Sequence, residues 1–184
     1  QGRWTKGPLV LAILDGIGVA PPADSNAVTL ARTPVLDTLK RDHPWTLLRA
    51  HGKSVGMPSD DDMGNSEVGH NALGAGRVVP QGAKLVEEAI TSGALFESRA
   101  WREALEACRG GTLHFLGLVS DGNVHSHVRH LDAMLRACHG AGVPRVRVHA
   151  LLDGRDVGAR SALDYIAPLE SRLSLMKDYS IASG

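Results

Sequence analysis

The chain has 184 residues, of which 43% are hydrophobic, so it can bury a core as one domain or as one domain and part of another. Its 20 basic and 20 acidic side chains cancel and only 4% of residues are aromatic, which argues against a nucleic-acid-binding surface. No apolar run approaches the roughly 20 residues needed to cross a bilayer, and residues 1–10 lack the pattern of a signal peptide. We therefore expect a cytosolic protein with no nucleic-acid or membrane partner.

Apolar runs and helical patterns alternate along the chain. Val-, Leu- and Ile-rich runs predict buried strands at LVLAIL (9–14), TLHFLGLV (112–119) and RVRVHALL (145–152), with a weaker one at YSIA (179–182). Helices are expected to begin at Thr33-Pro34 and to occupy most of residues 127–142. Strands that alternate with helices predict an α/β fold with a parallel sheet and right-handed crossovers. Pro80 and Gly82 interrupt the pattern and mark residues 77–83 as the best candidate for a change of domain.

Three expected strands each end in an Asp-Gly pair, which contains Asp15, Asp121 or Asp153. For any single pair a turn is the simpler explanation. Ligands of parallel α/β sheets bind at the carboxyl ends of strands, however, and polar residues are concentrated there in DGIG, SDGNVHSH and DGRD. The sequence therefore predicts a ligand site at these strand ends.

Ser66 lies in DDDMGNSEVGHNALGAGR (60–77), ahead of a helical, glycine-containing stretch. Serine is a favoured helix N-cap, and the same geometry forms an anion site. Ser66 could also be a nucleophile, which would need a base or a metal to activate it. His70, four residues on, could share a helix face with Ser66, although a surface histidine is as good an interpretation. A divalent ion held by Asp15 and Ser66 is the better account of activation, but two oxygen ligands are too few for a complete site.

Other polar residues favour structural interpretations. Adjacent aspartates project in different directions, so the run at residues 60–62 is read as a solvated acidic loop and not as a metal cluster. Cys108 and Cys138 have no metal-like spacing, so buried reduced thiols are expected.

The two later strand ends carry groups that suit a small phosphorylated hydroxy acid. His125 follows the second strand, and Arg155 lies between Asp153 and Asp156 after the third. A guanidinium can bind phosphate or carboxylate at two points, and a neighbouring carboxylate can accept hydroxyl hydrogen bonds. A purely structural Arg-Asp pair is the alternative.

Four motifs in this order, LDGIG, MPSDDDMGNSEVGHNALGAGRVV, SDGNVHSH and LLDGRDV, resemble the amino-terminal part of cofactor-independent (2,3-bisphosphoglycerate-independent) phosphoglycerate mutase, of the alkaline phosphatase superfamily. The resemblance implies interconversion of 2- and 3-phosphoglycerate in glycolysis through a phosphoserine intermediate. It also implies two divalent ions, Mn²⁺ or else Mg²⁺ or Co²⁺, and no requirement for 2,3-bisphosphoglycerate. Residues 1–78 would belong to a parallel-sheet, alkaline-phosphatase-like metal-binding domain, and residues 79–184 to an inserted α/β transferase domain.

Carried over by position, Ser66 resembles the phosphorylated serine and a metal ligand, and Asp15 resembles the ligand that shares that metal. His125, Arg155 and Asp156 resemble substrate-binding residues. The family's other metal ligands and several phosphate-binding arginines have no counterpart in the sequence, which resembles about the first third of such an enzyme. A metal-dependent phosphatase of the same superfamily and a non-catalytic phosphate-binding fragment are the alternatives. We expect the whole enzyme to be monomeric and the isolated piece to self-associate through an open sheet edge near residues 9–14.

Overall fold

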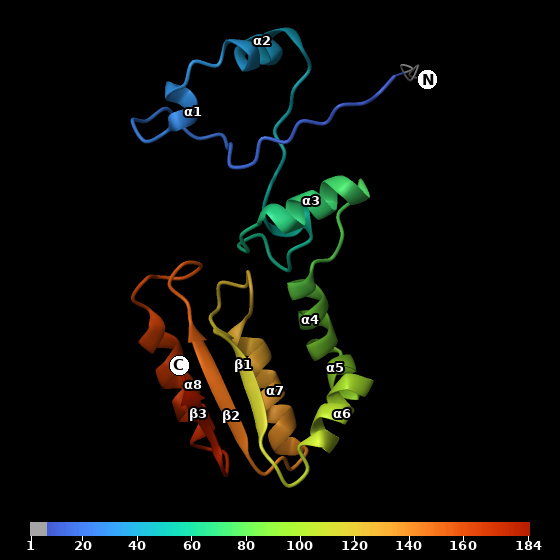
Figure 1. Cartoon of the computed structure of the whole chain (residues 1–184), viewed down its shortest axis with the longest axis vertical. Helices are drawn as coiled ribbons and strands as arrows, with labels where there is room; N and C mark the ends of the chain where they lie inside the picture. The colour runs from blue at the N-terminus through green and yellow to red at the C-terminus, as the bar shows by residue number, and fades with distance from the viewer. Residues whose placement is uncertain (1–6) are drawn as a thin grey trace. The chain divides into compact units, whose positions relative to one another are not determined.

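A computed structural model describes residues 7–184; residues 1–6, part of the stretch examined for a signal peptide, lie outside the described residues (Figure 1). The chain divides into two compact units, Gln1–Leu48 and Arg49–Gly184, which are described separately. None of the helices in the described part of the chain has the length and apolar composition needed to cross a bilayer.

The first unit contains two short helices, α1 (Ala27–Leu30) and α2 (Pro34–Asp42). Helix α2 confirms the helix predicted at Thr33-Pro34, with Thr33 as its N-cap residue and Pro34 as its first residue. Proline suits this position because the first turn leaves its backbone N–H groups without helical partners.

The strand predicted at residues 9–14 is wrong, because this stretch is irregular in the structure. A strand satisfies its backbone groups by pairing with a neighbouring strand, and none of residues 7–48 forms one. Leu9 and Val10 are 95% and 83% exposed, so these apolar side chains are not packed against other residues.

The second unit starts with helical segments and continues as an α/β sheet. Its elements are the 3₁₀ helix η1 (Gly52–Val55), the helices α3 (Ser66–Ala75), α4 (Gly82–Thr91), α5 (Ala94–Glu97) and α6 (Arg99–Ala107), strand β1 (Leu113–Val119), helix α7 (Val128–Gly140), strand β2 (Val146–Leu152), helix α8 (Ala162–Leu173) and strand β3 (Tyr179–Ser183). The predictions of strands near 112–119, 145–152 and 179–182, and of a helix over most of 127–142, are confirmed.

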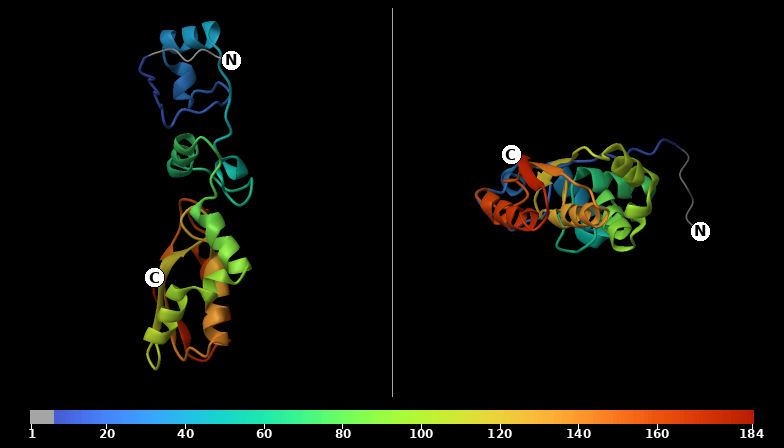
Figure 2. Two further views of the ribbon diagram at one scale, coloured as in Figure 1. Left: turned by 90° about the vertical axis from the view of Figure 1, so that its right-hand side faces the viewer. Right: turned by 90° about the horizontal axis from the view of Figure 1, so that it is seen from below.

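The sheet is parallel with strand order β1-β2-β3, which confirms the predicted α/β class. Leu113 pairs with Val146, which in turn pairs with Tyr179. Helices α7 and α8 make the two crossovers and lie side by side on one face (Figure 2). Right-handed crossovers between successive neighbouring strands place both helices on the same side of the sheet.

The main core lies between the sheet and these two helices. It is built from one residue each of β1 and β3, alternate residues of β2 and the inner faces of the helices: Val119, Leu135, Cys138, Val146, Val148, Ala150, Leu169, Leu173 and Tyr179. Residues at the intervening strand positions face the other side, where Leu116 is 74% exposed. A second, smaller cluster of Val55, Met57 and Val68 joins η1 to α3.

Candidate functional site

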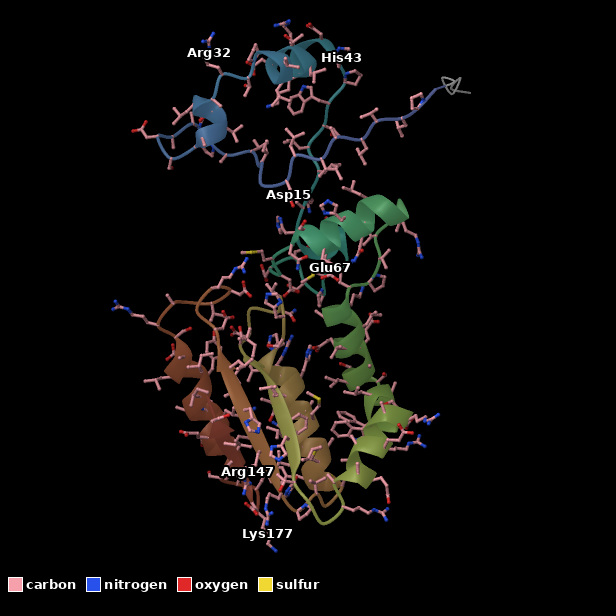
Figure 3. All side chains as sticks on the ribbon, in the orientation of Figure 1. Asp15, Arg32, His43, Glu67, Arg147 and Lys177 are labelled. Atoms are coloured by element: carbon pink, nitrogen blue, oxygen red, sulfur yellow. The ribbon has the colours of Figure 1, made fainter. Side chains whose placement is uncertain are left out.

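The N-cap of helix α3 lies one residue earlier than the sequence suggested. Asn65 is the N-cap residue, and its side-chain oxygen accepts a hydrogen bond from the Val68 backbone N–H at 3.0 Å. Ser66 is the first helical residue, so the prediction that Ser66 caps the helix is wrong. Asparagine caps as well as serine does, and its neighbour is thereby released from that role. Glu67 lies in the same first turn, where its charge complements the helix dipole (Figure 3).

Ser66 and His70 share a face of α3, as their spacing indicated. The Ser66 hydroxyl lies 3.2 Å from His70 Nδ1, which also lies 2.7 Å from the Ser66 carbonyl oxygen. A carbonyl oxygen only accepts, so the shorter contact requires the proton on Nδ1. In that tautomer Nδ1 cannot take a proton from the Ser66 hydroxyl, and the contact therefore does not make His70 the base for that serine.

The ends of β1 and β2 are joined by a network of hydrogen bonds centred on Asp153. Its Oδ2 accepts a hydrogen bond from the Ser120 hydroxyl at 2.6 Å, and its Oδ1 accepts from the backbone N–H groups of Gly154, Arg155 and Asp156 at 2.7 to 3.1 Å. The Ser120 hydroxyl and then these backbone N–H groups hold the pKa of Asp153 at about 2. The predicted concentration of polar groups at strand ends is therefore present at these two strands.

The expected substrate-binding residues lie around this network. His125 Nε2 is 3.8 Å from Asp156 Oδ2, and the imidazole is more exposed than the carboxylate. The backbone of Arg155 is fixed by Asp153, and its side chain is exposed. Within residues 7–184 the Arg155 guanidinium forms no ion pair, so the structural Arg-Asp pair considered above is absent from this part of the chain.

Asp15 lies in the first unit, in a turn where its Oδ1 accepts a hydrogen bond from the Gly16 N–H at 2.9 Å. Gly16 has a φ of +81°, which favours glycine there. Across residues 7–184 no group of three or more His, Cys, Asp or Glu side chains is arranged to hold a metal ion. Carboxylate and hydroxyl oxygens such as those of Asp15 and Ser66 are each of a kind that binds Mn²⁺ or Mg²⁺.

A cleft of about 520 Å³ lies within the second unit. Asn65 and Glu67, which flank Ser66 in the sequence, line one side, and Asn123 and His125 from the loop after β1 line the other. The turn that carries Ser66 and the loop that carries His125 therefore border the same space.

Residues that the sequence analysis set aside or did not single out connect the parts of this site. Asp62, read as part of a solvated loop, accepts a hydrogen bond from the Asn123 side-chain amide at 2.8 Å. Glu87 on α4 lies 2.7 Å from His130 Nε2 on α7. The residues of these pairs are 61 and 43 positions apart in the sequence, so no local sequence pattern indicates either contact.

The expectation for the cysteines is confirmed, since Cys108 and Cys138 are free and buried. Burial raises the pKa of the Cys138 thiol to about 12, which leaves it protonated and unreactive at neutral pH.

Comparison with known proteins identifies the family. Residues 86–184 match the family model described as the BPG-independent PGAM N-terminus. The chain belongs to the BPG-independent phosphoglycerate mutase family. It is 50% identical over 184 residues to a probable 2,3-bisphosphoglycerate-independent phosphoglycerate mutase of Leptospira interrogans, a match that covers 96% of this chain and 34% of that protein. A maize (Zea mays) mutase of the same name is 47% identical over 189 residues, covering 99% of this chain and 34% of that protein.

A solved structure agrees with this family. The crystal structure of Leishmania mexicana phosphoglycerate mutase at low cobalt concentration superimposes with a TM-score of 0.83 and 45% identity, over 92% of this chain and 32% of that one. The chain thus spans about a third of the length of the curated relatives that it matches.

Proposed function

We propose that this chain supplies the phosphoryl acceptor and part of the substrate site of an enzyme that interconverts 2- and 3-phosphoglycerate without 2,3-bisphosphoglycerate. The observation that carries the proposal is the shared cleft, in which the residues on either side of Ser66 face Asn123 and His125. The names of the Leptospira and maize relatives support both the reaction and the independence from 2,3-bisphosphoglycerate.

Each proposed residue has a role that its position supports. The Ser66 oxygen would attack phosphorus as the bond from phosphorus to the glycerate oxygen breaks, with the serine proton passing, in net terms, to that glycerate oxygen. The first-turn N–H groups of α3 favour the anionic group that Ser66 would then carry. His125 and Asp156 would hold glycerate oxygens, and Arg155 would bind a carboxylate or phosphate at two points with its exposed guanidinium. The glycerate would be retained and reoriented before the phosphoryl group returns to its other hydroxyl.

The proposed domain and metal assignments also involve the first unit and further parts of a longer protein. We assign residues 1–78 to an alkaline-phosphatase-like domain and residues 79–184 to a transferase domain. Asp15 and Ser66 would hold one of two divalent ions, Mn²⁺ or else Mg²⁺ or Co²⁺, together with ligands from the rest of a longer protein. Such ions neutralise phosphoryl charge and favour the serine alkoxide. We further propose a cytosolic, monomeric whole enzyme.

Two alternatives remain as outcomes of the test. The incomplete metal ligand set in residues 7–184 favours a non-catalytic phosphate-binding role. A metal-dependent phosphatase would use Ser66 in the same way. It would have no need of His125, Arg155 and Asp156, because a hydrolase does not have to retain the glycerate.

The test is Ser66→Ala in the whole protein, with covalent phosphate labelling and mutase turnover as the measurements. We expect both to be lost while the fold persists, because Asn65 and not Ser66 caps α3. Ser98→Ala is the matched control, since Ser98 caps α6 by accepting the Trp101 N–H. That control should cost about 1 kcal/mol of stability and retain labelling. Persistent labelling after Ser66→Ala would remove Ser66 as the acceptor, and labelling with hydrolysis but no isomerisation would favour the phosphatase.

A further inference from the structure

The cleft separates two parts of the second unit that have their own hydrophobic clusters. Val55, Met57 and Val68 pack η1 against α3 on one side, and the main core holds the sheet, α7 and α8 on the other. Met57 and Val68 line the cleft from the first part, and Asn123 and His125 line it from the second. Because the two clusters are separate, the contacts that cross the cleft help to set how far apart its sides lie.

Asp62 makes one such contact while also shaping its own loop. Its Oδ2 accepts a hydrogen bond from the Ser59 N–H at 2.7 Å, and its carbonyl oxygen accepts from the Gly52 N–H at 3.0 Å. Its Oδ1 accepts from the Asn123 side-chain amide at 2.8 Å. The carboxylate is therefore rigidly placed and reaches the opposite side of the cleft.

Asn123 is held just as firmly. It is 5% exposed and has a φ of +56°, a conformation that asparagine tolerates better than most residues. The preceding Gly122 donates its N–H to the Ser120 hydroxyl, and a Cβ on Gly122 would lie 2.8 Å from the Asp156 Cβ. The amide donor is thus fixed by the end of β1 and by the loop after β2.

This hydrogen bond joins the two loops that carry the proposed chemistry. Asp62 precedes Ser66 by four residues, and Asn123 precedes His125 by two. Beside the cleft, Glu87 on α4 lies 2.7 Å from His130 and 3.7 Å from Arg129, both on α7. These contacts also link α4 to α7.

We propose that the Asp62–Asn123 hydrogen bond is a clasp that holds the cleft closed and sets the separation between Ser66 and the His125 loop. Asp62 and Asn123 are positioning residues, since they act through the loops that they hold. Their effect on turnover rests on the proposed function, whereas their effect on the cleft does not.

Three variants isolate the clasp. Asn123→Gly removes the donor and leaves a residue that adopts a positive φ without strain. Asn123→Asp places two carboxylates at hydrogen-bonding distance, so they repel each other. The double variant Asp62→Asn with Asn123→Asp exchanges the two groups. Its amide can donate to the new carboxylate while its amide oxygen still accepts the Ser59 N–H, so every hydrogen bond can re-form.

The cleft is measured in this chain by the distance between spin labels on Ala75→Cys in α3 and Ala167→Cys in α8, both exposed positions. The labelled chain is diluted into an excess of unlabelled chain, so that distances within one molecule dominate even if the chain self-associates. The native cysteines are buried, and a sample without the two substitutions measures any background labelling. We expect a narrow distance distribution for the parent, broader and longer distributions for Asn123→Gly and Asn123→Asp, and recovery in the exchanged double variant. Circular dichroism confirms that each variant is folded. Unchanged distances in both single variants, or no recovery in the double variant, would overturn the clasp.

Turnover is measured on the whole protein that carries the same variants. We expect Asn123→Asp to lower kcat by about 10-fold, as for loss of a hydrogen bond to a charged group, with KM little changed and with recovery in the double variant. Equal kcat in all variants would overturn the positioning role. If the whole protein proves to lack mutase activity altogether, the proposed function fails, and the label distances still decide the clasp.

Discussion

Asp153 is the residue on which the loop after β2 depends. One carboxylate oxygen accepts three successive backbone N–H groups, and the other accepts the Ser120 hydroxyl. Its pKa of about 2 keeps it charged at neutral pH. The arrangement fixes the backbone of Arg155 and Asp156 without using either of their side chains.

We predict that Asp153→Ala loosens this loop and that Asp153→Asn does so much less. The alanine variant leaves three N–H groups without their acceptor, whereas the amide oxygen of asparagine can still accept all three. Hydrogen exchange at Gly154, Arg155 and Asp156 should quicken by roughly 10-fold in the alanine variant, the effect of losing a hydrogen bond to a charged group. Equal exchange in the parent and the alanine variant would show that the loop holds its shape by other contacts.

The direction of the pH effect follows from the depressed pKa of Asp153. Its ordinary value is 3.8, so the carboxylate contributes its full stabilisation above about pH 4, and this contribution is lost as the pH falls toward 2. Exchange protection of the three amides should decline over that window in the parent. The asparagine variant does not titrate there and should show a flatter profile.

At single residues, the sequence predicted local features better than long-range ones. The helix start at Ser66 was predicted to within one residue, because a cap depends only on its immediate neighbours. The role of Asp62 was missed, since its partner Asn123 is 61 residues away and no local pattern indicates the contact. For the same reason, the assignments of Ser66, His125, Arg155, Asp156 and Asp15 to a site stay predictions.

Among the elements, α7 shows how a histidine that lines the cleft can also be structural. His127 is the N-cap of α7, and its Nδ1 accepts a hydrogen bond from the Arg129 N–H at 3.1 Å. Only an unprotonated Nδ1 can accept. Burial, together with the charges of Arg129 and His130, lowers the pKa of His127 below its ordinary 6.5.

We predict that acid weakens α7 through His127. A histidine whose folded pKa is lowered contributes its stability above the unfolded value of about 6.5, and that contribution is lost as the pH falls below it. The midpoint temperature of thermal unfolding should therefore decrease as the pH is lowered from 7.5 to 5.5. The decrease should be smaller in His127→Asn, whose side chain caps without titrating. Identical pH slopes for the parent and His127→Asn would show that another group governs this range.

The elements also show where apolar pattern is insufficient. Residues 113–119 and 146–152 form strands because each has a parallel neighbour and a covering helix. Residues 9–14 have a similar apolar composition but form no strand, because no strand within residues 7–48 offers hydrogen bonds to them. Pattern alone predicts that a segment can form a strand; whether it does depends on a partner elsewhere in the fold.

At the scale of the molecule, the parallel sheet and its crossovers were predictable, but the uncovered sheet face was not. Helices α7 and α8 cover one face, and no element of residues 49–184 covers the other, on which Leu116 and Leu151 are 74% and 52% exposed. The self-association expected near residues 9–14 is therefore better argued from this face. Leu116 is paired with the polar His149 and Leu151 with Leu118, and exposed leucines such as these favour association.

We predict that these 184 residues alone self-associate through this face and do not turn over 3-phosphoglycerate, even with added Mn²⁺. Phosphoryl transfer depends on positioned charge neutralisation, and residues 7–184 hold no complete metal site. Sedimentation should show oligomers for the parent and a shift toward monomer for the double variant Leu116→Lys with Leu151→Lys, because burying lysine at the contact is unfavourable. Leu163→Lys, at an equally exposed leucine on α8, should leave the oligomers in place. A monodisperse parent would contradict association through the sheet face, and metal-dependent turnover by such a monomer would show that the chain completes its own active site.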